Sequence, residues 1–249
     1  MSIGIISAMR EEIQAIHEQL DLTNKVEKGR RTYYQGKLFN QEVILVFSRW
    51  GKVASATTVT QLINDFDVDE ILFTGVAGGI EDRINIGDIV IGKGLVQHDM
   101  DASPILPKFE IPLLGKSLFY TDEERTRRLF LAANNYISQI DTFFSKEALD
   151  TFTINRPVVY LGDIASGDQF ISDISHRDAI KKALPEVVCV EMEGAAVAQV
   201  CFEYNIPFTI IRTISDNSND NSEHDFPKFA KEIASEYALG VIKNYFEQQ

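Results

Sequence analysis

The sequence has few residues suited to redox, metal or nucleophile chemistry. Its 249 residues include two cysteines, Cys189 and Cys201, and both lie in apolar surroundings. We expect reduced core residues and not a disulfide or a metal-binding pair, as in a cytoplasmic protein. The absence of a Gly-x-Ser-x-Gly motif argues against a nucleophile elbow. A metal site at His98, Asp99 and Asp101 is less favoured than a solvated turn, because no second pair of ligands accompanies these residues.

Positive charge and long apolar segments are also scarce. The chain has 24 Lys and Arg against 37 Asp and Glu, a formal net charge of −13 at pH 7, and the basic residues form no cluster. Nucleic acid is therefore not expected as a partner. No apolar run approaches the roughly 20 residues of a membrane span, and the N-terminal one is too short for a signal peptide. We expect no membrane partner, a cytoplasmic location and a small-molecule ligand.

Short apolar runs alternate with amphipathic segments along the chain. The predicted strands are 3–7, 31–38, 42–48, 70–74, 88–91, 94–98, 158–164, 187–190 and 208–214. The predicted helices are 11–20, 52–66, 122–137, 175–184, 193–205 and 225–246. Residues 102–115 contain three prolines and are predicted to be a loop. This alternation predicts an α/β fold: one domain over residues 1–249 with three α/β/α layers and a central mixed sheet.

Carboxylates and glycines follow several of the predicted strands. The segments are 7–12 (SAMREE), 75–79 (GVAGG), 166–170 (SGDQF), 191–194 (EMEG) and 215–217 (SDN). Ligands of such sheets bind at the carboxyl ends of the strands, so we expect these segments to meet. The glycine segment does not match Gly-x-Gly-x-x-Gly, which makes a dinucleotide site a weak hypothesis. Taken alone, the glycine segment is about equally consistent with a tight turn and with a ligand lying close to backbone N–H groups.

These strand ends suit the cleavage of a glycosidic bond. One acid can protonate the leaving group, a second carboxylate can activate water, and negative charge favours the oxocarbenium-like sugar. Met9, Phe170 and Met192 would add an apolar wall for a flat base. For Glu12 or Glu193 taken singly, a simpler explanation is a carboxylate at a helix N-terminus, favoured by the helix dipole.

Seven segments together resemble one known family. They are IGIISAMREE, SRWGKVASA, FTGVAGGI, INIGDIVIG, SGDQFI, VEMEGAAVAQVC and PFTIIRTISD, in this order. Over nearly the whole chain the sequence is similar to the 5′-methylthioadenosine/S-adenosylhomocysteine nucleosidases of the nucleoside phosphorylase superfamily. The resemblance implies a nucleoside phosphorylase-like fold and a homodimer that serves methionine salvage without a metal or cofactor. It also implies hydrolysis of methylthioadenosine, adenosylhomocysteine and 5′-deoxyadenosine, with release of adenine.

The resemblance also implies roles for individual residues. Glu12 matches the residue that activates water, and Asp216 matches the acid that protonates N7 of adenine, with Ser215 supporting its orientation. Glu193 matches the carboxylate that binds the ribose hydroxyls, whereas Glu191 is expected to be a structural partner of a nearby donor. The remaining substrate-binding residues implied are Met9, Trp50, Val76, Gly78, Phe170, Ile171, Met192, Arg212 and Phe226.

Two of these residues depart from the family pattern. Many relatives have a small aliphatic residue at the position of Trp50 and a serine at that of Val76. Trp50 would reshape the ribose and 5′ region, and Val76 removes a hydroxyl that could hold water. The proline-containing segment 102–115 also differs, and in the family this region reaches the partner subunit's 5′ pocket.

Three alternatives stay open at this point. A purine nucleoside phosphorylase of the same fold would need a cationic phosphate site, whereas the turn after the first strand carries Glu11 and Glu12. Another nucleosidase, acting on aminofutalosine or on a nucleotide, is also open, although a nucleotide would require an additional basic patch that the sequence does not show. A non-catalytic purine-binding module would be expected to lack Glu12, Glu193 or Asp216.

Overall fold

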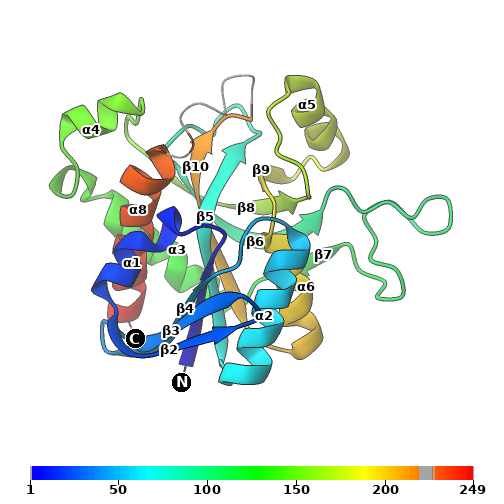
Figure 1. Cartoon of the computed structure of the whole chain (residues 1–249). Helices are drawn as coiled ribbons and strands as arrows, with labels where there is room; N and C mark the ends of the chain where they lie inside the picture. Colours follow the sequence, from blue (N-terminus) through cyan, green and yellow to red (C-terminus); the bar gives the residue numbers. More distant parts are fainter. Residues whose placement is uncertain (1, 219–225, 227, 249) are drawn as a thin grey trace.

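A central sheet of ten strands organises the protein (Figure 1). The computed structural model describes residues 2–218, 226 and 228–248. The strands are β1 (Ser2–Ser7), β2 (Asp21–Lys28), β3 (Arg31–Leu38), β4 (Gln41–Phe47), β5 (Glu70–Gly79), β6 (Ile89–Gln97), β7 (Leu118–Tyr120), β8 (Val159–Ser166), β9 (Val187–Glu191) and β10 (Phe208–Asp216). Their order is β10-β6-β8-β9-β5-β1-β4-β3-β2, with β7 paired to β6. Parallel and antiparallel pairs both occur, so the predicted mixed sheet is confirmed.

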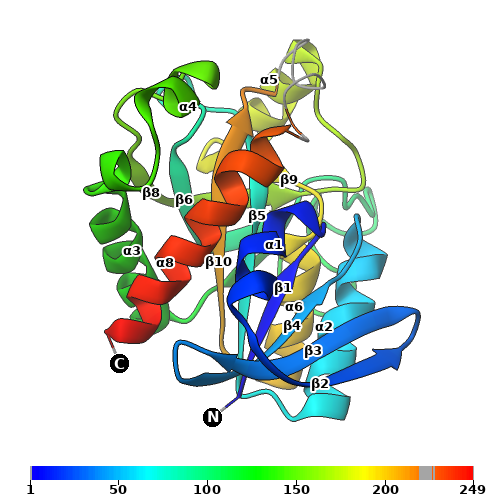
Figure 2. The same ribbon diagram turned by 60° about the vertical axis from the view of Figure 1, so that its left-hand side comes forward.

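Helices cover both faces of this sheet. They are α1 (Gln14–Gln19), α2 (Lys52–Phe66), α3 (Glu123–Ile137), α4 (Lys146–Thr151), α5 (Ile174–Ala183), α6 (Gly194–Tyr204) and α8 (Ser235–Glu247), with short turns η1 (Glu11–Ile13), η2 (Ile140–Thr142) and η3 (Ala230–Ala234). Helices α1, α3 and α8 lie together on one face, and α2 and α6 lie on the other (Figures 1 and 2). The expected three-layer arrangement is therefore confirmed.

Extra pairings of β10 and β9 bring the functional strand ends together. Strand β10 pairs with both β5 and β6, and β9 pairs with both β5 and β8, so five strands close into a ring. At the carboxyl end of β5, Gly78 lies opposite both Val190 and Asp216. At the end of β8, Ser166 lies opposite Glu191. The convergence expected from the sequence therefore follows from strand register.

The helices follow the sequence signals that predict them. Helix α3 begins after Asp122, whose carboxylate accepts the N–H of Arg125 at 2.9 Å, as an N-cap does. In α8, Tyr237, Val241 and Tyr245 recur every four residues, so they share one face, and all three are buried. Tyr237 meets Tyr136 of α3 edge to face at 5.6 Å, which joins the two helices.

Several predicted boundaries are wrong, for identifiable reasons. The strand predicted at 70–74 continues through the glycines to Gly79, because all ten residues are buried between neighbouring strands. The two strands predicted at 88–91 and 94–98 form the single strand β6, and a register shift between Gly92 and Gly94 absorbs the irregularity. The helix predicted at 11–20 is a 3₁₀ turn followed by a short α-helix. The predicted start of the last helix, at 225, lies outside the described residues.

Three elements were not predicted from the sequence. Strand β2 is polar and almost wholly exposed at the sheet edge, so it lacks an apolar alternation. Strand β7 has only three residues, and α4 has six, too few to show a period.

The segment 98–117 projects from the body at the right of Figure 1. The loop predicted at 102–115 contains no helix or longer strand and is closed by an isolated bridge between Ile111 and Lys116. Its apolar side chains are unusually open, with Ile105 87% and Leu113 104% exposed. Within the described residues, no helix has the length and apolarity needed to cross a bilayer.

Candidate active site

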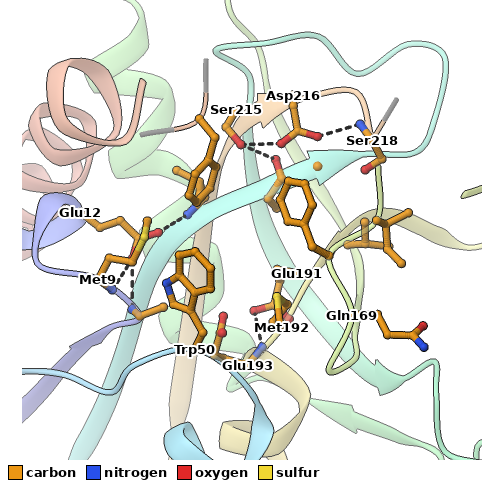
Figure 3. Close-up of a pocket in the computed structure, with 18 residues that line it drawn as sticks. Met9, Glu12, Trp50, Gln169, Glu191, Met192, Glu193, Ser215, Asp216 and Ser218 are labelled. Carbon is orange, nitrogen blue, oxygen red and sulfur yellow. Dashed lines mark hydrogen bonds between the residues drawn. The ribbon is translucent and has the colours of Figure 1, made fainter. Parts of the chain in front are cut away.

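A cavity of about 320 Å³ opens where the strand ends converge (Figure 3). Twelve of the thirteen site residues expected from the sequence line it: Met9, Glu12, Trp50, Val76, Gly78, Phe170, Ile171, Met192, Glu193, Ser215, Asp216 and Phe226. The lining residues that the sequence did not single out for the site are Ala8, Ala77, Gln169, Val190, Glu191 and Ser218. The cavity thus combines three separate carboxylate-bearing segments with apolar walls.

Glu12 is held in place by hydrogen bonds to both of its carboxylate oxygens. Oε2 accepts the Ser7 hydroxyl and the N–H groups of Ala8 at 3.1 Å and Met9 at 3.0 Å. Oε1 accepts the N–H of Val76 at 3.0 Å. Burial raises the pKa of Glu12, although the Ser7 bond, the charge of Arg212 and the backbone donors oppose this. Such a fixed carboxylate with a raised pKa suits a general base.

Asp216 ends β10 and is fixed by its neighbours in the chain. The Ser215 hydroxyl donates to Oδ2 at 2.8 Å, and the Ser218 N–H donates to Oδ1 at 2.8 Å. Figure 3 shows these contacts at one end of the cavity, apart from Glu12. Two acids therefore reach the same cavity from different strand ends.

Glu191 and Glu193 are two residues apart but have different environments. Glu191 ends β9 and accepts hydrogen bonds from the Ser166 hydroxyl, from the Gly194 N–H at 2.8 Å and from Arg212 Nη2 at 2.6 Å. The expectation that Glu191 is a structural partner of a nearby donor is confirmed. Glu193 precedes α6, and among the described residues its carboxylate accepts only the N–H of Gly51, at 2.7 Å. It therefore keeps acceptor capacity for a ligand.

Burial also dominates the protonation of Glu193. Loss of solvent, together with the negative charge of Glu191, raises the pKa of Glu193 to about 8, although the Gly51 N–H and Arg212 oppose this rise. A carboxyl group in this range can both donate and accept hydrogen bonds near neutral pH.

Arg212 is the one expected site residue that does not line the cavity. Its side chain is only 1% exposed; Nη2 binds Glu191, and the guanidinium lies over the Phe73 ring, 4.1 Å from its centroid. A Cβ atom on Gly75 would lie 3.0 Å from Glu12 Oε1 and 3.2 Å from Arg212 Nη1, so Arg212 is also close to Glu12. Arg212 thus lies behind the carboxylates, and its charge opposes the effect of burial on the pKa of Glu12 and Glu193; its part in substrate binding stays a prediction.

Aromatic side chains form the outer wall of the cavity. Phe226 meets Trp50 edge to face, with ring centroids 6.3 Å apart, and meets Phe170 at 6.2 Å. Trp50 is 58% exposed and Phe170 is 45% exposed. These rings and Met9 give an apolar surface that could cover a flat base or an alkyl group.

A polar network joins two of the cavity walls from behind. Asp99 accepts Lys52 Nζ at 2.6 Å and the N–H of Asp168 at 3.0 Å, and Asp168 in turn accepts the N–H of Lys52 at 2.8 Å. Burial opposes ionisation, but the Lys52 and Asp168 contacts keep the pKa of Asp99 below its ordinary value. The network ties the Trp50 segment to the segment of Gln169 and Phe170.

The network also bears on the metal hypothesis. Asp99 is occupied by Lys52 and Asp168, and Asp101 accepts hydrogen bonds from Ser103 in its own loop. In the part of the chain that the structure describes, no group of three or more His, Cys, Asp and Glu side chains is arranged to hold a metal ion.

Ser218 is a lining residue that sequence reasoning did not identify. Its side chain is fully buried, and Oγ has no hydrogen-bond partner among the described residues. A buried hydroxyl without a partner is costly, so this group is available to a bound molecule. Its only sequence signal is its place two residues after Asp216.

Comparisons with known proteins agree with this geometry. Residues 2–247 match the model of the Phosphorylase superfamily. A 5′-methylthioadenosine/S-adenosylhomocysteine nucleosidase of Staphylococcus carnosus is 35% identical over 246 residues, covering 97% of this chain and 99% of the relative.

Two solved structures are similar over the whole chain. The Neisseria meningitidis 5′-methylthioadenosine/S-adenosylhomocysteine nucleosidase in complex with methylthio-immucillin-A has a TM-score of 0.86 and 30% identity, covering 100% of this chain and 99% of that one. Futalosine hydrolase of Helicobacter pylori has a TM-score of 0.83 and 31% identity, covering 100% and 98%. The chain belongs to the 5′-methylthioadenosine/S-adenosylhomocysteine nucleosidase family of the phosphorylase superfamily.

Proposed function

We infer that the protein hydrolyses the N-glycosidic bond of 5′-methylthioadenosine and S-adenosylhomocysteine, releasing adenine and the 5-substituted ribose. Family membership over nearly the full chain supports this reaction. We extend the proposal to 5′-deoxyadenosine, because the apolar walls do not require a polar 5′ group. The continuous sheet and the match over 2–247 support one domain.

We propose that two acids divide the chemistry of this hydrolysis. Asp216, in its protonated form, gives a proton to N7 of the base, and the C1′–N9 bond breaks with its electron pair going to adenine. Glu12 takes a proton from the water that attacks C1′, so that the sugar leaves with a hydroxyl group. Glu193 accepts hydrogen bonds from the ribose hydroxyls, and the negative charges stabilise the developing cation.

The hydrogen bonds of Glu12 favour water over phosphate as the nucleophile. An anion bound after β1 would need free backbone donors, as anion-binding turns provide. The N–H groups of Ala8, Met9 and Val76 all donate to Glu12 instead. A phosphate here would meet a carboxylate and no free N–H among these three, which is the observation that carries hydrolysis over phosphorolysis.

We propose that the active form is a homodimer. Ile105 and Leu113 expose apolar side chains on the projecting segment 102–115, which a monomer would leave in water. Reaching across to the 5′ region of a second copy would bury them and complete its pocket.

The product of the reaction in phosphate-free buffer tests the proposed function. Purified protein is incubated with methylthioadenosine, with and without phosphate, and the sugar is identified by mass spectrometry. We expect free 5-methylthioribose at a rate that does not depend on phosphate. Methylthioribose 1-phosphate formed only with phosphate would overturn the proposal. Glu12→Gln, purified in the same way, controls for contaminating nucleosidases.

A further inference from the structure

A second cavity, of about 500 Å³, adjoins the first at its outer end. The two share Ala8, Met9, Trp50 and Phe226, so the apolar wall of the first cavity leads directly into the second. The residues that line the outer cavity but not the first one include Arg10, Glu11, Phe47 and Arg49. A methylthio group is small, and nothing in it would use these charged residues.

Neither arginine of the outer cavity forms a salt bridge with a described residue, although the charge of Arg10, after the Thr32 hydrogen bond and Lys25, also lowers the pKa of Glu27. The Arg10 guanidinium lies over the Phe47 ring, 5.0 Å from the centroid, and it makes no ion pair with the described residues. Arg49 Nη2 donates to the backbone carbonyl of Arg30 at 2.6 Å and likewise forms no salt bridge in the described part of the chain. Unpaired guanidinium groups beside one cavity are notable in a chain with net charge −13, because acidic partners are abundant.

The backbone at Arg49 adds an independent observation. Its φ is 79°, in the left-handed region that a side chain other than glycine rarely adopts. The conformation places an arginine directly before Trp50, at the junction of the two cavities.

We propose that the outer cavity binds the charged end of a long 5′-substituent, with Arg10 and Arg49 holding a carboxylate. Planar guanidinium groups are well matched to carboxylates, and Glu11 supplies the one opposite charge among the described residues that line the cavity, suited to an ammonium group. The favoured substrates are adenine nucleosides whose 5′-thioether chain ends in a carboxylate, with an amino acid end fitting best. This inference rests on the proposed function and ranks S-adenosylhomocysteine above methylthioadenosine.

Three substrates of matched chain length separate the contributions of the charges. They are S-adenosylhomocysteine, 5′-(3-carboxypropylthio)adenosine, which lacks the ammonium group, and 5′-(butylthio)adenosine, which lacks both charges. We expect kcat/KM to fall in that order, and the carboxypropylthio-to-butylthio ratio to decrease as salt is added. A ratio at or below one would overturn the proposal, even if all three are hydrolysed and the proposed function stands.

Variants of the arginines test the assignment. Arg10→Gln and Arg49→Gln should each lower the carboxypropylthio-to-butylthio ratio by about two- to fivefold, as expected for an exposed charge pair. Arg49→Gly should lower this substrate ratio equally without lowering the melting temperature, because glycine accepts the positive φ. A merely structural role would instead change both substrates together.

Arg30→Gly is the matched control. Arg30 is also exposed with a positive φ of 58°, but it lines neither cavity. Its substitution should leave both activities and their ratio unchanged. An unchanged ratio in Arg10→Gln and Arg49→Gln would refute the carboxylate site. If the wild-type protein hydrolysed none of the three substrates, the proposed function itself would be refuted.

Discussion

Replacing Arg212 with methionine should reduce both stability and activity at low pH. Methionine keeps an apolar side chain of considerable length over Phe73 but removes the positive charge that binds Glu191 at 2.6 Å. The two side chains are 1% and 2% exposed, so solvent cannot replace the lost partner. Breaking a buried pair from one side costs about 3–5 kcal/mol. At about 2–4 °C per kcal/mol for a protein of this size, the melting temperature should fall by roughly 6–20 °C.

The pH dependence of Arg212→Met provides a second readout. The charge of Arg212 lowers the pKa of both Glu12 and Glu193, opposing the effect of burial. Without this charge, Glu12 takes up its proton at higher pH. Because a general base must be ionised, the acidic limb of kcat/KM against pH should move to higher pH.

The measurements are thermal unfolding and a pH–rate profile with methylthioadenosine. Arg125→Met is the matched control, because Arg125 pairs at 2.7 Å with Glu70, another buried carboxylate, away from the cavity. Arg125→Met should lower stability less than Arg212→Met does, because the Arg125 side chain is 25% exposed. It should not move the acidic limb of the pH–rate profile. A melting temperature of Arg212→Met within about 2 °C of the wild type, with the acidic limb unmoved, would refute the reasoning.

Three further substitutions test other parts of the site. Asp216→Asn should lower kcat by about 10² to 10⁴-fold while adenine still binds, measured by turnover and calorimetry; a loss below tenfold would remove the acid role. Glu193→Gln should reduce the pH dependence of stability. In the wild type the folded pKa of Glu193, about 8, lies above the ordinary 4.5, so the free energy of unfolding falls as pH rises from 4.5 to 8. Glutamine does not titrate, so the variant should lack this fall. The same change of unfolding free energy with pH in both proteins, measured by urea unfolding, would contradict this. Asp99→Asn should raise KM for methylthioadenosine several-fold with a smaller change in kcat, whereas Asp65→Asn, which alters the pair with Lys28 at the other end of α2, should change neither constant.

Local sequence patterns predicted the parts of the fold that depend on burial. Apolar runs mark β1, β5 and β10 because these strands are covered on both sides. The polar edge strand β2 could not be found this way, because its pairing with β3 depends on backbone hydrogen bonds and not on an apolar pattern.

In the site, too, local patterns were predicted, whereas contacts between distant segments were not. Residues at strand ends were predicted together because parallel and crossing strands bring those ends to one place. The direction of the Arg212 side chain was not predicted, since it depends on Glu191 of another strand. Asp99 was likewise missed as a support of the walls, because its partners Lys52 and Asp168 are distant in the sequence.

The position of Trp50 has a practical consequence for spectroscopy. It is the single tryptophan of the chain, and it lines both cavities with 58% of its side chain exposed. Indole emission responds to the polarity of its surroundings and to stacked rings, so a ligand that fills either cavity will change it. The native protein therefore carries its own fluorophore at the junction of the cavities, and the affinities of adenine and of each 5′-substituent can be titrated without a label.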